Sequence, residues 1–467
     1  MGTLVWFRND LRLQDNPALY NACERGDVVA VFFFCVAQWR DHDVGDNRLT
    51  FLLDCLHHLK RDLHNHRIAL RVEHAARFAE VPDRIVGLAR ALKLDRVAFN
   101  EEYPLNEKKR DSRVIRACNA ADITTDVYHA GTILPPGSVL TGNGDPYTVY
   151  SPFKRRWLSQ VDGGTLEPLG LPRRQKRQVA ESSTLPDSID GIDRGRVTKE
   201  VPAGEAEAQR RLADFMAGPS RRYENDRDFP DLNGTSTLSA YLSVGAISPR
   251  QCLSKAVEAN RGRIGDGDPG ISTWISELIW RDFYRHVIAL FPHVSCGQAF
   301  RPKADQVAWR HSVTDLAAWQ QGLTGYPLVD AGMRQLNETG WMHNRLRMVT
   351  AMFLSKHLLL DWRVGERYFM NQLVDGDFAA NNGGWQWSAS TGTDAAPYFR
   401  IFNPNTQAKR FDPEGRFIRR WVPELEEAPL RNLFDPQKYP TDGYPRPIVD
   451  HRAARQRALN AFKALKR

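Results

Sequence analysis

Strand-like and helix-like segments alternate through the first 130 residues of the chain. Short apolar runs rich in β-branched and aromatic residues are typical of strands, and they lie at residues 3–7, 28–34, 68–72, 96–99 and 123–128. Amphipathic stretches of helix length, such as 47–66 and 81–94, separate them. Strands that alternate with helices favour parallel pairing. The pattern therefore predicts an α/β domain with a doubly wound parallel sheet over residues 1–130.

The turn after the first strand lacks the usual dinucleotide-binding glycines. Residues 8–12 read Arg-Asn-Asp-Leu-Arg instead of the Gly-x-Gly-x-x-Gly string that admits a diphosphate. Such a string occurs at 265–270, but it contains Pro269 and follows a helical or polar stretch. We therefore expect residues 265–270 to form a surface loop.

Beyond residue 130 the pattern changes twice. Residues 131–200 contain Pro/Gly clusters and a basic run at 173–177, which indicate a long, mostly irregular connector. Residues 201–467 carry no strand pattern and predict a larger all-α domain. Hydrophobic residues make up 42% of the chain and charged residues 26%, as in soluble globular proteins. The net charge of +8 is compatible with a nucleic-acid partner.

Several classes of protein are disfavoured by the sequence. The 6 cysteines are scattered without a C-x-x-C pair, so we expect neither a disulfide framework nor a metal site. Residues 1–10 lack the regions of a signal peptide, and the longest apolar run, 28–37, is too short to span a membrane. We expect a cytoplasmic monomer that holds no metal ion.

Residues 271–290 predict a helix with an unusual face. Trp274, Glu277, Leu278 and Arg281 recur at helical spacing, and Trp280 and Tyr284 adjoin them. Ordinary core packing around a Glu–Arg pair would give a similar stripe. Two tryptophans beside an acid and a base also suit a pocket that binds a flat ring, with aromatic side chains stacked on its face and hydrogen bonds to its edge.

A second helix is predicted around residues 341–360. Trp341, Asn344, Arg345 and Met348 share one face, with Arg347 to the side. An amide, two guanidiniums and a thioether on adjoining surfaces could face a base, a phosphate and a flavin. Helix packing with arginines that extend to solvent is the alternative interpretation.

Two further segments stand out. Residues 234–239 place several hydroxyls before an apolar helical run, which indicates either helix capping or an anion site. Residues 375–387 combine two carboxylates, two amides, a double glycine and two tryptophans, and we expect a functional loop there. Their Asp–Asn spacing fits no EF-hand or two-metal pattern.

Four segments in order, 6–13, 274–284, 340–348 and 375–397, resemble the DNA photolyase/cryptochrome family over nearly the whole chain. The resemblance is greatest to bacterial class I cyclobutane pyrimidine dimer photolyases of the folate-antenna type. It implies an all-α domain that binds FAD. It also implies light-driven repair of pyrimidine dimers in DNA, by electron transfer from photoexcited reduced FAD to a flipped-out dimer.

The resemblance assigns residues to five roles. FAD would be bound by Tyr223, Thr235, Ser236, Thr237, Leu238, Ser239, Trp274, Arg281, Asn344, Arg347, Asp375, Asp377 and Asn381. Damaged DNA would be bound by Glu277, Trp280, Tyr284, Asn344, Arg345, Met348 and Trp387, with Glu277, Asn344, Met348 and Asn381 as the catalytic set. Trp309, Trp362 and Trp385 would carry electrons to the flavin, and His42, Asn106, Glu107 and Cys296 would contact a 5,10-methenyltetrahydrofolate antenna.

Two points stay open at this stage. Gly297 stands where related folate binders can carry a lysine, so a deazaflavin or no antenna is also compatible with the sequence. A blue-light-sensing cryptochrome is the alternative function. Cryptochromes usually carry a long tail, whereas this chain stops soon after a helix-like segment at 452–466. A (6-4) photolyase is a second alternative, but proteins of that branch usually have a histidine near the position of Met348.

Overall fold

The computed structural model describes residues 2–193 and 201–465, so residues 194–200 of the predicted connector and 466–467 of the predicted helical domain lie outside the described residues. The chain forms two compact units. The first unit is Met1–Arg221 with Ser236–Pro292, and the second unit is Arg222–Thr235 with His293–Arg467.

The first unit contains the predicted parallel sheet. Its strands are β1 (Gly2–Phe7), β2 (Asp27–Phe34), β3 (Ala69–His74), β4 (Arg96–Asn100) and β5 (Thr124–Tyr128). They pair in the order β3-β2-β1-β4-β5, and every pair is parallel. In the register, Val5 of β1 lies opposite Ala30 on one side and Ala98 on the other. The predicted α/β class is confirmed.

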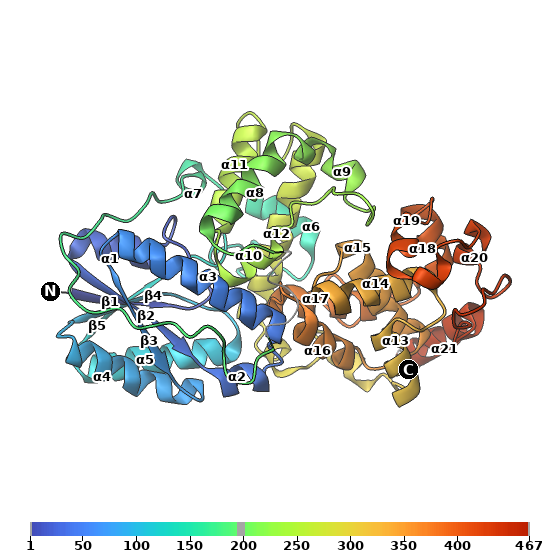
Figure 1. Ribbon diagram of the computed structural model, residues 1–467, viewed down its shortest axis with the longest axis horizontal. Coiled ribbons are helices and arrows are strands. Elements are labelled where there is room, and N and C mark those ends of the chain that lie inside the picture. The colour runs from blue at the N-terminus through green and yellow to red at the C-terminus, as the bar shows by residue number, and fades with distance from the viewer. Residues whose placement is uncertain (1, 194–200, 466–467) are drawn as a thin grey trace. The chain divides into compact units, whose positions relative to one another are not determined.

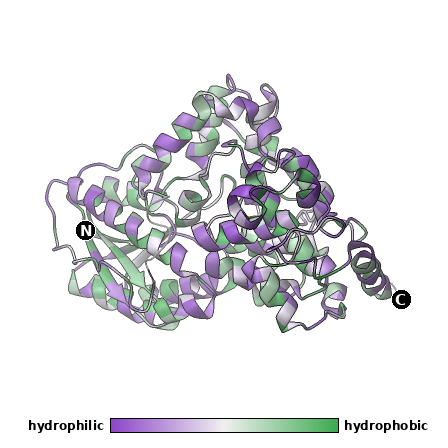
Figure 2. Cartoon of the chain, turned by 45° about the vertical axis from the view of Figure 1, so that its right-hand side comes forward, coloured by the Kyte–Doolittle hydropathy of each residue, from purple (hydrophilic) through white to green (hydrophobic). Residues whose placement is uncertain are grey.

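Helices cover both faces of this sheet (Figure 1). Helices α1 (Pro17–Arg25) and α3 (Asp46–Asn65) lie on one face, and α4 (Val81–Ala91) and α5 (Leu105–Ala120) lie on the other. The short α2 (Val36–Asp41) and 3-10 helix η1 (Phe78–Glu80) complete this part. Because both faces are covered, the central strands β1 and β2 are mostly apolar, as Figure 2 shows.

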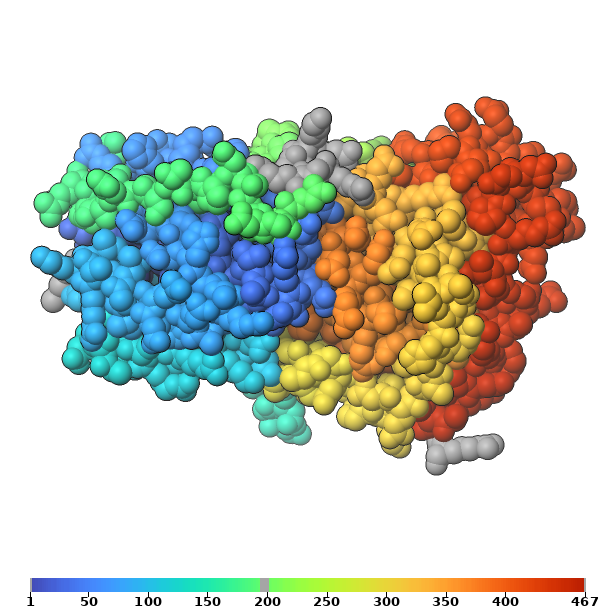
Figure 3. Space-filling model, turned by 60° about the horizontal axis from the view of Figure 1, so that its bottom comes forward, coloured from blue at the N-terminus to red at the C-terminus, as the bar shows by residue number. Residues whose placement is uncertain are grey.

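The connector segment lies along the sheet domain. Helices α6 (Tyr150–Leu158) and α7 (Gly163–Leu166) interrupt an otherwise irregular chain. Ser183 N donates to Leu70 O (2.8 Å) and Gln175 N donates to His66 O (2.9 Å). Figure 3 shows this segment in green over the blue residues of the first unit.

Helices complete the first unit. They are α8 (Glu205–Ala217), η2 (Pro219–Arg222, whose last residue belongs to the second unit), α10 (Ser239–Val244), α11 (Pro249–Ala259) and α12 (Pro269–Leu290). The predicted helix at 271–290 is confirmed as α12. It begins where the Asp268 carboxylate accepts from Gly270 N (3.0 Å) and Ile271 N (3.2 Å). The glycine string at 265–270 therefore forms a turn and the start of this helix.

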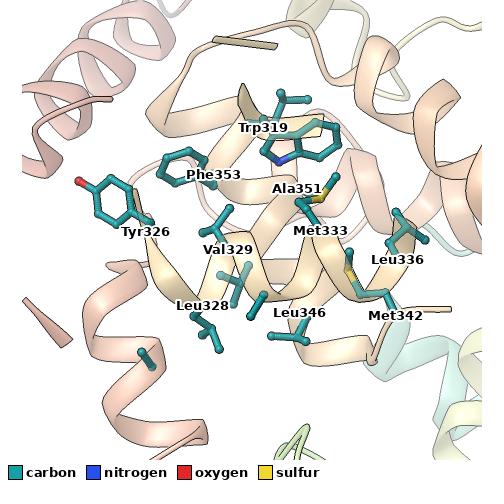
Figure 4. Packing of buried hydrophobic residues seen from close by; sticks show 14 of the residues in the cluster. Trp319, Tyr326, Leu328, Val329, Met333, Leu336, Met342, Leu346, Ala351 and Phe353 are labelled. Atoms are coloured by element: carbon teal, nitrogen blue, oxygen red, sulfur yellow. The ribbon is translucent and has the colours of Figure 1, made fainter. Parts of the chain in front are cut away.

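The second unit is helical throughout the part that the structure describes. Its elements are α9 (Tyr223–Asp226), η3 (Val294–Cys296), η4 (Pro302–Gln306), α13 (Val313–Gln321), α14 (Pro327–Thr339), α15 (Asn344–Met352), the π-helical η5 (Phe353–His357), α16 (Trp362–Gln372), α17 (Phe378–Ala389), α18 (Pro404–Phe411), α19 (Arg416–Trp421), η6 (Pro423–Leu425), α20 (Leu430–Phe434) and α21 (His451–Ala464). Helix α14 lies in its core, where Trp319, Val329, Met333 and Phe353 are buried (Figure 4).

The structure corrects the extent of the predicted helix at 341–360. Helix α15 begins only at Asn344, because the ring nitrogen Nδ1 of His343 accepts from Arg345 N (3.2 Å) and caps the helix. Trp341 precedes this cap and does not share the helix face with Asn344 and Met348. After Met352 the helix continues as the π-helical turn η5.

The prediction of a loop at 375–387 was wrong for most of its length. Residues 378–389 form helix α17, because the Asp377 carboxylate accepts from Ala380 N (3.0 Å) at its first turn. Gly383 and Gly384 lie inside this helix. Tertiary packing of Trp385 and its neighbours outweighs the low helix propensity of this glycine pair.

Candidate functional site

The hydroxyl-rich segment before α10 is held by two side chains from other helices. Arg211 of α8 donates through Nη1 to Thr237 Oγ1 (2.8 Å), and Trp274 of α12 donates through Nε1 to Ser236 Oγ (3.3 Å). Thr237 has a φ of 51°, which is unfavourable for a β-branched residue. The surrounding contacts therefore fix an unusual backbone at this segment.

Arg211 is a residue that sequence reasoning missed. Its Nε donates to Glu207 Oε1 (2.8 Å), one helical turn earlier, and this holds the guanidinium near Thr237. Residues 235–239 contain no lysine or arginine, so Arg211 brings a positive charge to them. The spacing of Glu207 and Arg211 was readable in the sequence, but their nearness to Thr237 depends on the tertiary fold.

The predicted stripe on α12 divides into a buried and a half-buried part. Trp274 and Leu278 are buried, and the Trp274 ring packs against Phe215 (centroids 5.6 Å apart). Arg281 donates to Gly131 O (2.6 Å) and to Leu242 O (3.2 Å). Glu277, Trp280 and Tyr284 are half-buried, so part of each side chain is accessible. Leu238 is buried and Ser239 is exposed at the start of α10.

A buried ion pair marks the second unit. Arg347 Nη2 donates to both carboxylate oxygens of Asp375 (3.0 and 2.8 Å), and Arg347 Nε donates to Met342 O (2.8 Å). The Asp375 side chain is 1% exposed and the Arg347 side chain 25%. The predicted pairing of these two residues is present.

Two amides on α17 are oriented by one residue of α16. Asn381 Nδ2 donates to Glu366 O (3.0 Å), and Asn382 Nδ2 donates to Glu366 Oε1 (3.2 Å). Because the Asn381 nitrogen is used in this way, its carbonyl oxygen points away from Glu366. Glu366 was not predicted from the sequence, since nothing in its local pattern distinguishes it from a surface acid.

Arg345 lies in a mixed charged and aromatic setting. Its Nη2 is 2.7 Å from Asp228 Oδ2, and its guanidinium lies 4.3 Å from the centroid of the Phe411 ring. Asn344 beside it is exposed, and Met348 is half-buried on the same helix. Trp387 on α17 is also half-buried. Burial lowers the pKa of His343, the cap of this helix, to about 4.

The three tryptophans predicted to carry electrons belong to one hydrophobic cluster. Trp362 and Trp385 are buried in it, and Trp309 packs against it. Within the described residues, their indole N–H groups have no hydrogen-bond partner. A Cβ atom at Gly365 would lie 2.1 Å from Trp385 Cη2, so the glycine leaves room for this ring. Gly365 was another residue that the sequence did not reveal.

The predicted antenna residues of the first unit lie together. Asn106 Nδ2 and His42 Nε2 are 3.1 Å apart, and Glu107 follows Asn106 on α5. Burial raises the pKa of Glu107 to about 7, and the Glu102 carboxylate adds to this rise. Burial lowers the pKa of His42. Near neutral pH the His42 ring is therefore neutral, whereas the Glu107 carboxyl is present in both its protonated and its ionised form.

Cys296 of the second unit is exposed and is followed by a constrained glycine. Gly297 has a φ of 74°, and its carbonyl accepts from Arg363 Nε (2.6 Å). A side chain at position 297 would have to adopt the left-handed conformation, which costs about 1–2 kcal/mol. This backbone gives a physical reason for glycine at this position.

The predicted FAD-binding residues fall in both units. Ser236, Thr237, Leu238, Ser239, Trp274 and Arg281 belong to the first unit, and Tyr223, Thr235, Asn344, Arg347, Asp375, Asp377 and Asn381 belong to the second. Tyr223 is buried, with the Arg227 guanidinium 5.4 Å from its ring centroid. The first unit therefore offers hydroxyls beside a cation, and the second unit, taken by itself, offers an Arg–Asp pair.

Residues 2–193 and 201–465 contain no group of three or more histidine, cysteine, aspartate or glutamate side chains placed to hold a metal ion. No helix in these ranges is long and apolar enough to span a membrane.

Comparison with known proteins places the chain in one family. Residues 3–173 match the family described as DNA photolyase, and residues 274–464 match the FAD binding domain of DNA photolyase. The chain is 44% identical to deoxyribodipyrimidine photo-lyase of Escherichia coli (strain K12), over 99% of both chains. The chain belongs to the DNA photolyase family.

Solved structures agree with this assignment. A bacterial class III photolyase from Agrobacterium tumefaciens is similar with a TM-score of 0.90 and 34% identity, covering 100% of this chain and 98% of that one. The cryptochrome of Synechocystis sp. PCC6803 is similar with a TM-score of 0.84 and 25% identity, covering 98% and 99%. Photolyases and cryptochromes therefore share this fold, and the fold alone does not separate them.

Proposed function

We propose that the chain is a deoxyribodipyrimidine photo-lyase, which repairs cyclobutane pyrimidine dimers in DNA in a light-driven reaction. The observation that carries the proposal is the 44% identity to a protein of that name over 99% of both chains. The match to an FAD-binding domain indicates that the cofactor is FAD. Bound reduced FAD would supply, on excitation by light, the electron that opens the dimer and would take it back afterwards.

The residues of the chain would bind and orient this cofactor. Arg211, Ser236 and Thr237 would face its diphosphate, since a guanidinium and hydroxyls suit phosphate oxygens. Asn344, Arg347, Asp375 and Asn381 would contact its flavin and ribityl parts. The Glu366 carbonyl, which fixes the Asn381 amide, would present the Asn381 oxygen to the ring. Tyr223, Thr235, Leu238, Ser239, Trp274, Arg281 and Asp377 would complete the contacts.

A second group would recognise the lesion. A dimer must leave the duplex to reach a flavin, and the poor stacking of a damaged step lowers the cost of flipping. Trp280, Tyr284, Met348 and Trp387 would form apolar contacts with it. Glu277 and Asn344 would bond the pyrimidine edges, and Arg345 would contact phosphate.

Trp309, Trp362 and Trp385 would conduct electrons to the oxidised flavin and restore its active state. The proposal also includes a monomeric state and a cytoplasmic location. It further includes a folate antenna, which would be contacted by His42, Asn106, Glu107 and Cys296. Arg363 donates to the Gly297 carbonyl. Its guanidinium would supply the positive charge near the folate that Gly297 cannot provide. We also keep the division into residues 1–130, 131–200 and 201–467 as a proposal about domains.

A light-dependence assay tests the function. The purified, reduced protein is incubated with an oligonucleotide that contains one thymine dimer, in blue light and in darkness. We expect dimers to disappear in light alone. A protein that binds FAD and changes its spectrum in light, yet leaves the dimer intact, would instead support the cryptochrome alternative.

A further inference from the structure

Helix α6 of the connector is fastened along α12. Tyr150 Oη donates to Ser276 O (2.8 Å), and Lys154 Nζ donates to Ser276 Oγ (2.7 Å). Further along, Trp157 Nε1 donates to Asp282 Oδ2 (3.0 Å). The acceptors span two turns of α12, and all of these residues belong to the first unit. Helix α6 therefore has a fixed position on α12.

The first residue of α6 stacks on the tryptophan predicted to meet damaged DNA. The Tyr150 and Trp280 ring centroids are 3.6 Å apart and the rings are inclined by 7°. This spacing leaves almost no lateral offset. Aromatic pairs by themselves prefer an offset or edge-to-face geometry. The hydrogen bonds of α6 must therefore hold the two rings face to face.

Neighbouring rings complete the support. Phe283 meets Tyr150 and Trp280 edge-on, at centroid distances of 5.9 and 5.7 Å. Tyr284 lies 5.6 Å from Trp280, one helical turn further along. Tyr150 is 7% exposed, whereas Trp280 is half-buried. One face of the indole is thus covered from behind, while part of the ring stays accessible.

We propose that Tyr150 is a positioning residue for damage recognition, which holds the Trp280 indole so that a flipped dimer meets the face opposite Tyr150. The inference rests on the proposed function, in which Trp280 contacts the lesion. A half-buried tryptophan that is already immobilised loses little conformational freedom on binding, so its contact with the dimer yields more affinity. The connector would then contribute to specificity as well as linking two parts of the chain.

Tyr150 does not act as a placeholder that the dimer displaces. Its hydroxyl is bonded to α12, and its helix is tied at Lys154 and Trp157. Withdrawal of the ring would break these contacts. The lesion therefore uses the accessible side of Trp280, and Tyr150 remains in place.

Binding of damaged and undamaged duplexes of one sequence tests the proposal. Tyr150→Leu removes the ring, and Tyr150→Phe keeps the stack but loses the hydroxyl. Tyr147→Leu is the matched control, because Tyr147 meets Phe153 on the same segment and has no stack on Trp280. We expect Tyr150→Leu to reduce the affinity ratio of damaged to undamaged DNA by about twofold to tenfold, the usual worth of an aromatic pair. The Phe variant should lose less than Tyr150→Leu, because Lys154 and Trp157 still hold α6 on α12, and the control should keep the ratio.

A double-mutant cycle separates positioning from general stability. In a Trp280→Leu background, Tyr150→Leu should cause no further loss of discrimination. Additive losses, or a lowered melting temperature of Tyr150→Leu with an unchanged ratio, would overturn the proposal. If Tyr150→Leu does not fold, Tyr150→Met is used, since methionine fills irregular apolar space. An unchanged ratio in Trp280→Leu itself would contradict the assignment of Trp280 to the lesion. It would also contradict the proposed role of Tyr150, which depends on that assignment.

Discussion

Two sets of tryptophans, one in each unit, are held in different ways. In the first unit, Trp157 and Trp274 donate their indole N–H to Asp282 and Ser236, and Trp280 is stacked on Tyr150. In the second unit, Trp309, Trp362 and Trp385 lie in or against an apolar cluster, where the described residues offer their N–H groups no acceptor. The first set is fixed by polar bonds and stacking, and the second by packing.

This difference is not a general property of the second unit. Trp319, whose ring centroid lies 5.9 Å from that of Trp385, donates to Thr350 O (3.0 Å). A buried donor without a partner is rare and needs an explanation. An electron carrier needs a close neighbour and a dry surrounding more than it needs a hydrogen bond. Trp6 and Trp421 also lack an acceptor, so the feature supports the assignment without identifying the carriers alone.

The largest effect is expected from Trp385→Phe. The change should abolish photoreduction of oxidised flavin, because it removes a proposed electron carrier from the packed cluster. Absorption spectra recorded during illumination with an external thiol would measure this. Trp421→Phe, a half-buried tryptophan of the same unit, serves as the control and should photoreduce normally. Normal photoreduction by Trp385→Phe would break the comparison between the two sets.

The buried ion pair of the second unit should give the next largest effect. Arg347→Ala leaves the buried Asp375 carboxylate without its partner, and such a loss typically costs about 3–5 kcal/mol. We expect a protein that unfolds more easily and retains little FAD, as measured by release on heating. Arg334→Ala is the matched control, because Arg334 pairs with Glu424 of the same unit, whose side chain is 31% exposed and stays solvated without its partner. Equal FAD content in both variants would contradict the assignment.

Two substitutions separate lesion recognition from strand positioning. Glu277→Ala should weaken binding of dimer-containing DNA by about 1–3 kcal/mol, since it leaves pyrimidine-edge donors without an acceptor. Arg345→Ala should weaken the binding of damaged and undamaged DNA alike. It should also reduce the slope of the logarithm of affinity against the logarithm of salt concentration by about 1. Binding isotherms at several salt concentrations distinguish them, with Glu277→Gln as the conservative control. Full damage discrimination in Glu277→Ala would exclude this part of α12 from the lesion contact.

A smaller, pH-dependent effect is expected at Glu107. Burial raises the pKa of Glu107 from 4.5 to about 7. Between these values the folded protein keeps a proton that the unfolded chain has lost, so stability falls as pH rises through this window. At pH 8 the melting temperature of Glu107→Gln should therefore be about 2 °C higher than that of the wild type, which corresponds to roughly 1 kcal/mol in a large domain. At pH 5 the two melting temperatures should be almost equal.

Glu24→Gln provides the control for this experiment, because Glu24 is exposed on α1 of the same unit. It should not alter the melting temperature at either pH. The same shift for Glu107→Gln at pH 5 and pH 8 would show that Glu107 does not titrate in this range.

The sequence was sufficient where one physical signal dominated. Strands β1 and β2 were predicted because both faces are covered, which leaves continuous apolar runs. Helix α17 was missed although Asp377 is a good cap, because Gly383 and Gly384 lower helix propensity and the packing of Trp385 that outweighs them is tertiary. The pair of Arg347 and Asp375 followed from the family resemblance.

Other contacts could not be predicted from the sequence. Arg211 and Thr237 are 26 positions apart, and Tyr150 and Ser276 are 126 apart. Local patterns carry no information about such pairs, since the fold of the whole unit brings them together. Glu366 orients Asn381 through its main-chain carbonyl, which any residue type would provide.

Light repair by chemically reduced protein tests the division between the two sets of tryptophans most directly. Wild type, Trp385→Phe and Trp280→Leu are each reduced fully, mixed with a dimer-containing oligonucleotide below saturation, and given one short exposure to light. We predict wild-type repair by Trp385→Phe, because an already reduced flavin needs no electron carrier, and reduced repair by Trp280→Leu, because fewer dimers are bound. Loss of repair in Trp385→Phe together with normal repair in Trp280→Leu would contradict the account.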